Sequence, residues 1–181
     1  MSPKTYSSEG IILARRNFGE ADRIISIYTK DYGRLSFIAK GVRKLTSRKR
    51  ASLEVFTHIS FLAHRGKSLD IITEAQTLEY YRNMRKSLKK VSLAYFFCEV
   101  VGRITREGEG NEELYDLTLT YLEELKTAKT LKRLRYKFIY EILTLLGFWP
   151  KDKTLPNPDY VLESVLERQL SSIRVGKKLL A

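Results

Sequence analysis

The sequence predicts an α+β protein, in which a five-stranded barrel over residues 1–80 precedes an α-helical domain over residues 81–181. Apolar and polar residues alternate before about Tyr80, as in half-buried strands, whereas apolar residues recur at helical spacing after it. The 181 residues, 43% of them hydrophobic and 11% aromatic, are enough to bury a core. The change of period therefore predicts two regions of different architecture.

Five strands are expected in the first eighty residues, separated by turn signals such as Asp31-Tyr32-Gly33. In the clearest of them, every odd-numbered residue from Leu53 to Ala63 belongs to one face. The expected strands cover residues 10–16, 23–29, 34–40, 53–64 and 69–78. Five short antiparallel strands predict a small barrel. An OB-fold is favoured because it commonly binds single strands, and an SH3-like barrel is also compatible.

The helical half is predicted to contain four helices. A long helix over residues 87–106 is followed by a second that begins after an N-cap at Asn111, a third over residues 130–146 and a short one over residues 160–170. The first helix carries an apolar stripe of Leu88, Val91, Tyr95, Cys98 and Val101. Consecutive rings inside an apolar helix mostly pack, so Tyr95, Phe96 and Phe97 are all expected in the core.

The basic loop, residues 40–50, lies between two predicted strands and carries six cations and no carboxylate. The whole chain has 33 Lys and Arg against 21 Asp and Glu, a net charge of +12. Two further acid-free runs lie at residues 82–90 and 126–137. Cations that meet phosphates release condensed counterions, so this pattern favours a nucleic-acid partner over a merely solvated loop.

Several function classes find little support. One cysteine, Cys98, and two separated histidines predict no disulfide and no zinc site within the chain. No cofactor is implied, and no constellation of side chains suggests catalysis. The sequence has no apolar run of about 20 residues and no apolar stretch typical of a signal peptide near its start. We expect a cytoplasmic, nucleoid-associated protein that is not an enzyme.

Three segments resemble the N-terminal signature of the RecO family of bacterial recombination mediators. They are GIILARRNFGEADR at residues 10–23, YGRLSFIAKGVR at residues 32–43 and LEVF at residues 53–56. A Leu-Leu-Gly-Phe helix end at residues 145–148 extends the resemblance at lower specificity. Many members carry a Cys-rich zinc module just after this point, whereas residues 151–159 contain no cysteine. The chain therefore resembles a shortened, zinc-less member.

The resemblance implies an OB-fold that binds single- and double-stranded DNA and anneals complementary strands. It also implies that the protein helps to load RecA onto coated single strands together with RecR, and that it contacts the single-stranded-DNA-binding protein. Within the family motif at residues 19–22, Gly19, Glu20 and Asp22 are expected to be structural, with the carboxylates capping or pairing with Arg23.

The predicted DNA contacts are cations on the barrel rim, where they would meet phosphates and confer little sequence preference. They are Arg15, Arg16, Arg34, Lys40, Arg43, Lys44, Arg48, Lys49 and Arg50. Bases could also stack on exposed rings, for which the candidates are Phe18, Tyr28, Tyr32 and the Tyr80-Tyr81 pair, although any of these could be core residues.

A second predicted site, in the helical domain, would bind the acidic, hydrophobic tail of the single-stranded-DNA-binding protein in an apolar cleft edged by cations. Its candidate residues are Lys86, Lys89, Lys90, Lys132, Arg133 and Arg135. These charges could equally well only solvate helix faces. Two alternative functions fit the same sequence: an RNA- or tRNA-binding accessory module, and a protein-interaction adaptor for acidic peptides.

Overall fold

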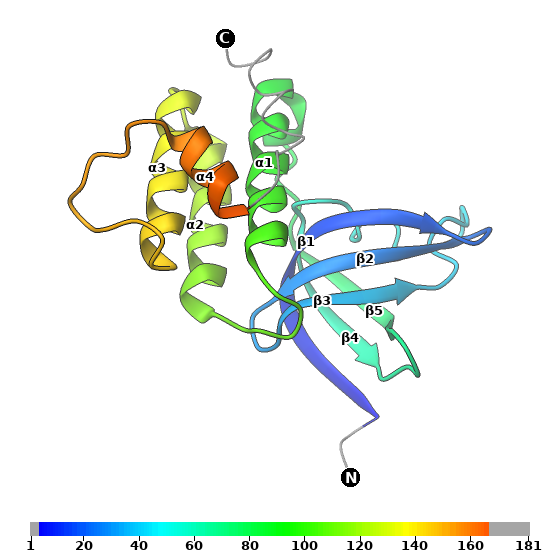
Figure 1. The fold of residues 1–181 in the computed structure, drawn as a ribbon. Coiled ribbons are helices and arrows are strands. Elements are labelled where there is room, and N and C mark those ends of the chain that lie inside the picture. Colours follow the sequence, from blue (N-terminus) through cyan, green and yellow to red (C-terminus); the bar gives the residue numbers. More distant parts are fainter. Residues whose placement is uncertain (1–3, 167–181) are drawn as a thin grey trace. The chain divides into compact units, whose positions relative to one another are not determined.

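The computed structural model describes residues 4–166, which form two compact units (Figure 1). The barrel unit comprises residues 4–80 together with Thr105–Glu112, and the helical unit comprises residues 81–104 and 113–166. The connection between the first two long helices thus belongs to the barrel unit, although it lies far along the chain from the strands.

The barrel unit is a closed five-stranded barrel. Its strands are β1 (Thr5–Phe18), β2 (Asp22–Thr29), β3 (Gly33–Ala39), β4 (His58–His64) and β5 (Asp70–Glu79). They are ordered β1-β2-β3-β5-β4, and β4 pairs with β1 to close the barrel. All pairs are antiparallel except β3 with β5. This Greek-key arrangement confirms the predicted OB-fold and leaves no unpaired edge.

The barrel core is formed by the inward faces of all five strands. The rings of Phe37 and Phe61 meet edge to face, with centroids 5.1 Å apart, among buried aliphatic residues of β1, β2 and β5. A bulge in β1 between Ile12 and Ala14 shifts the register against β2. Such an extra residue bends the strand, as barrel closure requires.

The predicted strand over residues 53–64 is wrong in its first half, because β4 begins only at His58. Residues 53–57 form turns, and Phe56 has a left-handed φ of 54°. The Phe56 N–H nevertheless donates to the Ile12 carbonyl (2.7 Å), and the Ile12 N–H donates to the Thr57 carbonyl (3.1 Å). Leu53, Val55 and Thr57 are buried as the alternation predicts. The pattern therefore predicted their burial but not their backbone conformation.

Strand β1 is longer than expected, since it already begins at Thr5. Residues 5–9 are mostly polar and give no alternation, but they pair with β4 from Thr5 opposite His64 to Glu9 opposite Ser60. Pairing with a distant strand extends β1 beyond its apolar segment.

The helical unit contains the short 3-10 helix η1 (Met84–Lys86) and the helices α1 (Leu88–Ile104), α2 (Glu112–Thr127), α3 (Leu131–Leu145) and α4 (Pro158–Leu166). The predicted starts of all four helices agree to within about two residues, and residues 167–170 of the predicted fourth helix lie outside the described range. Rings of Phe97, Tyr121 and Phe138 pack together, with centroids 4.3 to 5.8 Å apart. None of the helices within residues 4–166 is long and apolar enough to cross a membrane.

The predicted core of α1 needs correction at two positions. Leu88 is 67% exposed and Tyr95 is 43% exposed, whereas Phe96, Phe97 and Cys98 are buried. Buried side chains occupy most of α1 from Ser92 to Val101, so the buried surface is wider than one stripe and is centred on different residues.

The segment Thr105–Glu112 is tied to one end of the barrel by backbone hydrogen bonds. The Gly108 N–H donates to the Arg34 carbonyl (2.9 Å), and the buried Tyr28 hydroxyl donates to the Asn111 carbonyl (3.2 Å). Gly33 has a φ of +69°, and a Cβ there would lie 2.2 Å from the Glu109 carbonyl oxygen. Only glycine permits so close a backbone approach.

Candidate nucleic-acid interface

The basic loop lies in the connection between β3 and β4 and consists of turns without regular secondary structure. Two of its apolar neighbours, Val42 and Leu53, reach the barrel core and are fully buried. Five of the six cations of the loop lie at the surface, and the sixth, Lys49, is half-buried. Leu45, at the outer part of the loop, is 91% exposed.

Hydrogen bonds hold the start of the basic loop against the turn between β1 and β2. The Asp22 carboxylate accepts from the Gly41 N–H (2.7 Å), and the Ala21 carbonyl accepts from the Arg43 N–H (2.9 Å). The Arg43 guanidinium also donates to the Gly19 carbonyl (3.2 Å). Asp22 therefore caps the loop and does not pair with Arg23, but its expected structural role is confirmed.

Five cations of the basic loop are exposed. Arg43 is held by the Gly19 carbonyl, and the other four are Lys40, Lys44, Arg48 and Arg50. None of the four makes an ion pair with a carboxylate in the part of the chain that the structure describes. Within residues 4–166 their charge is therefore not neutralised by a carboxylate. A surface of this kind attracts polyanions and retains its side-chain freedom until a ligand binds.

Lys49 differs from its neighbours because its ammonium is used by the barrel. It is half-buried, and its Nζ donates to the carbonyl of Ile72 in β5 (2.8 Å). Burial lowers the pKa of Lys49, since desolvation disfavours the charged form. Lys49 thus fastens the second half of the basic loop to the barrel.

Arg15 is also engaged, through a carboxylate that sequence reasoning missed. Glu54 lies between Arg15 (2.9 Å) and Arg23 (3.4 Å), whose side chains are 30% and 12% exposed. Burial, followed by the nearby charge of Arg15, lowers the pKa of Arg23. Glu54 is the sole carboxylate between Asp31 and Asp70 in the sequence. A lone carboxylate among so many cations could have indicated that Glu54 forms ion pairs with them.

The two remaining predicted contacts lie in different places. Arg16 is exposed on β1, near the turn that holds the basic loop. Arg34 is half-buried at the start of β3, about 20 Å along the strand from Lys40. Its guanidinium donates to the Thr105 carbonyl (3.3 Å). Arg16 therefore lies at the end of the barrel where the β1–β2 turn holds the basic loop, and Arg34 lies toward the other end.

The candidate stacking rings also separate. Tyr28 is buried, and burial raises its pKa to about 12. Tyr32 is 39% exposed at the opposite end of the barrel and packs edge-on against Tyr6, with centroids 5.1 Å apart. Tyr81 is buried as well. Phe18, which is 46% exposed, is the candidate that lies beside the basic loop.

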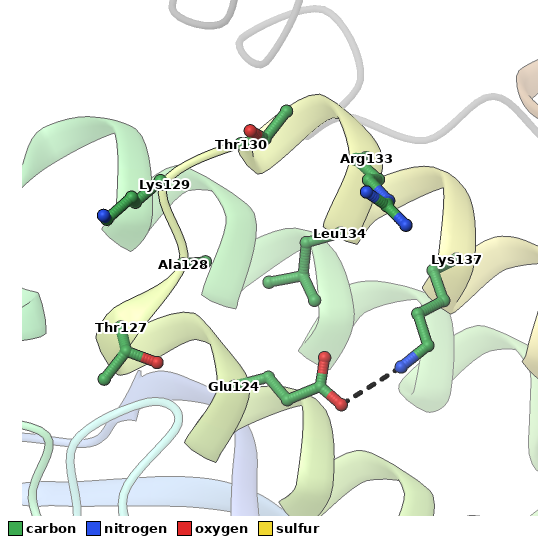
Figure 2. A pocket seen from close by; sticks show the side chains of 8 residues that line it. All are labelled: Glu124, Thr127, Ala128, Lys129, Thr130, Arg133, Leu134 and Lys137. Atoms are coloured by element: carbon green, nitrogen blue, oxygen red, sulfur yellow. Dashed lines mark hydrogen bonds and ion pairs between the residues drawn. The ribbon is translucent and has the colours of Figure 1, made fainter.

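The helical unit has a hollow of about 450 Å³ where α2 turns into α3 (Figure 2). Figure 2 shows Leu134 between the two helices, with Arg133 and Lys137 on one side and Lys129 on the other. Lys137 pairs with Glu124 (3.2 Å). The lining is completed by Thr127, Ala128 and Thr130. The hollow thus combines an apolar floor with three cations and one carboxylate.

Of the six residues predicted to bind a peptide, only Arg133 lines this hollow. Lys86, Lys89 and Lys132 are exposed elsewhere on the helical unit. Lys90 donates to the carbonyl of Lys126 (2.7 Å). Arg135 pairs with Asp159 and lies over the Phe96 ring, 4.2 Å from its centroid. Sequence reasoning did not assign Lys129 and Lys137 to this site, although both lie in the acid-free run at residues 126–137.

Within residues 4–166 no group of three or more His, Cys, Asp or Glu side chains could hold a metal ion. His58 lies 3.6 Å from Glu9, and Cys98 is buried in α1.

Comparison with known proteins agrees with this architecture. The family model for the N-terminal part of Recombination protein O matches residues 1–81, and the model for its C-terminal part matches residues 85–151. These matches cover both the barrel strands and the helices α1 to α3.

Curated relatives are similar along most of the chain. The protein named DNA repair protein RecO from Pelotomaculum thermopropionicum is 36% identical over 147 residues, which are 81% of this chain and 57% of that protein. Its namesake from Dehalococcoides mccartyi strain 195 is 32% identical over 155 residues (86% and 61%), and that from Rubrobacter xylanophilus is 35% identical over 147 residues (81% and 59%).

The chain thus spans about three fifths of the length of the curated relatives that it matches. Both family models match in the expected order and divide between the strands and the helices. The OB-type barrel, the helices that follow it and these matches together show that the chain belongs to the Recombination protein O family.

Proposed function

We propose that this protein binds DNA through the basic loop of its OB-type barrel and acts in recombinational repair by annealing complementary strands. The observation that carries the proposal is the set of exposed, unneutralised cations on the loop, namely Lys40, Lys44, Arg48 and Arg50. Relatives of this chain are named DNA repair proteins, which supports the same process.

The proposed mechanism of annealing is electrostatic and involves no chemistry on DNA. Phosphates of two strands repel each other, and cations of the protein replace part of their counterion atmosphere. Two strands that are each screened by basic surface can approach closely enough to pair by their own complementarity. Arg43, within the loop, and Arg16, exposed near the end of β1, extend the phosphate-binding surface.

Annealing of two complementary oligonucleotides, one with a donor and one with an acceptor dye, tests the proposal. We expect the protein to accelerate pairing at low salt. If about six phosphates are engaged, the affinity for a single strand should fall with a log-log salt slope of about −4. Binding that does not depend on salt, or pairing at the unassisted rate, would contradict the proposal.

RNA binding is the main alternative for the same surface, because phosphate contacts do not distinguish the two nucleic acids. Competition between a single-stranded DNA and a structured RNA of equal length decides between them. Preferential displacement of the DNA by the RNA would favour the accessory-module alternative. We expect the DNA to remain bound at equal concentrations.

We further propose that the hollow between α2 and α3 binds the acidic tail of a single-stranded-DNA-binding protein, and that the protein acts with RecR to load RecA. The support for the tail site is the apolar floor at Leu134 beside Lys129 and Arg133. Such a hollow can accept an apolar side chain while its cations hold carboxylates.

Reversing Lys129 and Arg133 to Glu in the full chain tests this site, with Lys132→Glu as the control, because Lys132 is exposed on the same helix but does not line the hollow. We expect the double variant to weaken binding of a synthetic acidic tail peptide and to leave binding of bare DNA unchanged. Equal loss in the control would show that only the overall charge matters.

A further inference from the structure

An exposed aromatic ring lies at the edge of the basic loop and is not used by the barrel core. Phe18 is the last residue of β1 and is 46% exposed, whereas Phe37 and Phe61 are almost fully buried. The buried cluster at the centre of the barrel is complete without Phe18. The ring is therefore available to a ligand.

The register of β1 against β2 places Phe18 on the outer face of the barrel. Arg15 pairs with Ile25, which is a core residue, so Arg15 belongs to the inner face of the barrel. Side chains alternate along a strand, so Asn17 also belongs to the inner face, and Arg16 and Phe18 belong to the outer face. Arg16 lies opposite Ile24, and Ile24 lies opposite Ile38 of β3. A cation, an aromatic ring and two aliphatic side chains thus share one face.

The same contacts that fix the basic loop bring two more cations to Phe18. Phe18 pairs with Asp22, whose carboxylate holds the Gly41 N–H and so fixes the position of Lys40. The Arg43 guanidinium reaches the Gly19 carbonyl, one residue after Phe18. We call the group of Arg16, Phe18, Lys40 and Arg43 the outer corner.

We propose that the outer corner is a stacking site for an unpaired base of single-stranded DNA, with the Phe18 ring against the base and the three cations on the flanking phosphates. This inference rests on the proposed function and adds to it a second kind of contact. Ring and cations alternate over a short distance, as required for a strand whose bases and phosphates alternate. OB-folds use this region, the outer face of their second and third strands and the turn before it, for oligonucleotides.

Stacking at the outer corner gives the protein a means to prefer single strands, which phosphate contacts alone provide only weakly. The bases of a duplex are already stacked on each other, so reaching Phe18 would require unstacking. An unpaired base has a free face, and each stacked base contributes about 1 to 3 kcal/mol. The site would therefore hold unpaired strands and release them once they have annealed.

The test compares Phe18→Ala and Phe18→Trp with the wild type and with Leu45→Ala in the full chain. Leu45 is a suitable control because it is an exposed apolar residue of the same basic loop. Binding of an oligothymidine and of a duplex of equal length is measured by anisotropy over a series of salt concentrations. Thermal unfolding of each variant confirms that the fold is retained.

We expect Phe18→Ala to lose roughly 5- to 150-fold in affinity for the single strand, which corresponds to one stacked base. Its salt slope should remain that of the wild type, because no phosphate contact is removed. Phe18→Trp should restore binding, and its added tryptophan emission should be quenched by the oligothymidine relative to the wild type, which has only Trp149. Leu45→Ala and all duplex affinities should change little.

Four results would overturn the inference. Unchanged binding by Phe18→Ala, while removal of the loop cations abolishes it, would leave the proposed function intact and eliminate stacking. Equal loss for single strand and duplex with a flatter salt slope would show that the ring only positions Arg16 and Arg43. A changed oligomeric state of Phe18→Ala would assign the ring to a protein contact, and failure of the wild type to bind any DNA would reject both proposals together.

Discussion

The basic loop of the barrel and the basic segment around α3 have similar composition, but the fold treats their cations differently. In the loop, Lys40, Lys44, Arg48 and Arg50 are exposed and make no ion pair with a described carboxylate. On α3, Arg135 pairs with Asp159 and covers Phe96, and Lys137 pairs with Glu124 and Glu141. Within such a run, the cations that lack an internal partner in the described part of the chain, such as these four of the loop and Lys129 and Arg133 of the helical unit, are therefore the better candidates for binding.

The physical reason lies in the neighbours that each architecture provides. Helices place residues three and four apart on the same face, so a cation of α3 meets carboxylates of its own helix and of its neighbours. Glu141 follows Lys137 by four residues and shows this directly. A loop that leaves the barrel has no such periodic neighbours, and the sequence places no carboxylate between residues 40 and 50.

Removing cations from the basic loop should give the largest effect on DNA. The variant Lys40→Ala, Lys44→Ala, Arg48→Ala should bind single-stranded DNA roughly ten- to a hundredfold more weakly at low salt and flatten the log-log slope by about 2. Its melting temperature should change little, because exposed charges contribute little to folding. Anisotropy titrations and thermal unfolding measure the two quantities.

The matched control for the loop variant removes three exposed cations of the helical unit, Arg82→Ala, Lys89→Ala and Lys132→Ala. It changes the net charge by the same amount. We expect it to keep most of the DNA affinity. Equal loss in both triple variants would show that the whole positive field, not the loop, determines binding.

Removing Arg135 should affect stability and not DNA binding. Arg135→Ala loses the ion pair with Asp159 and the contact with the Phe96 ring, and leaves the 26% exposed carboxylate without its partner. We expect a loss of about 1 to 3 kcal/mol in the free energy of unfolding, measured in urea. Lys132→Ala on the same helix should be close to neutral, and a similar loss there would contradict the contrast drawn for α3.

Lys49 provides the smallest and sharpest test, because it belongs to the basic loop but is engaged by the fold. Lys49→Met keeps the apolar stem and removes the ammonium that the Ile72 carbonyl accepts from. We expect a loss of about 1 kcal/mol in stability, typical of one hydrogen bond, and a small change in DNA affinity. Lys44→Met should show the reverse, and unfolding in urea beside anisotropy titrations gives both numbers.

The buried position of Lys49 makes the free energy of unfolding depend on pH. Burial lowers the pKa of Lys49 in the folded state relative to the unfolded chain, so the unfolded chain binds the proton more tightly. The free energy of unfolding therefore increases as pH rises through the two pKa values of Lys49. Below both values the buried ammonium is protonated, and its desolvation destabilises the fold most. Lys49→Met removes this pH dependence.

The order of the elements and most of the barrel's core were determined by the sequence alone. Alternation depends only on which face of a chain is buried, so it identified Ile59, Phe61 and Ala63 correctly and also marked Leu53 and Val55 as buried. Helical spacing located α1 to α3 to within about two residues. The basic loop could be recognised from composition alone, because residues 40–50 carry six cations and no carboxylate.

Tertiary structure alone decided which polar groups meet. Packing of the β3–β4 connection against the strands brings Glu54 between Arg15 and Arg23, ties Gly41 to Asp22 and places Lys49 on the carbonyl of Ile72. Closure of the barrel extended β1 to Thr5 and turned residues 53–57 out of the strand conformation. These contacts join residues far apart in the chain, and local periodicity carries no information about such pairs, because each depends on how separate strands align.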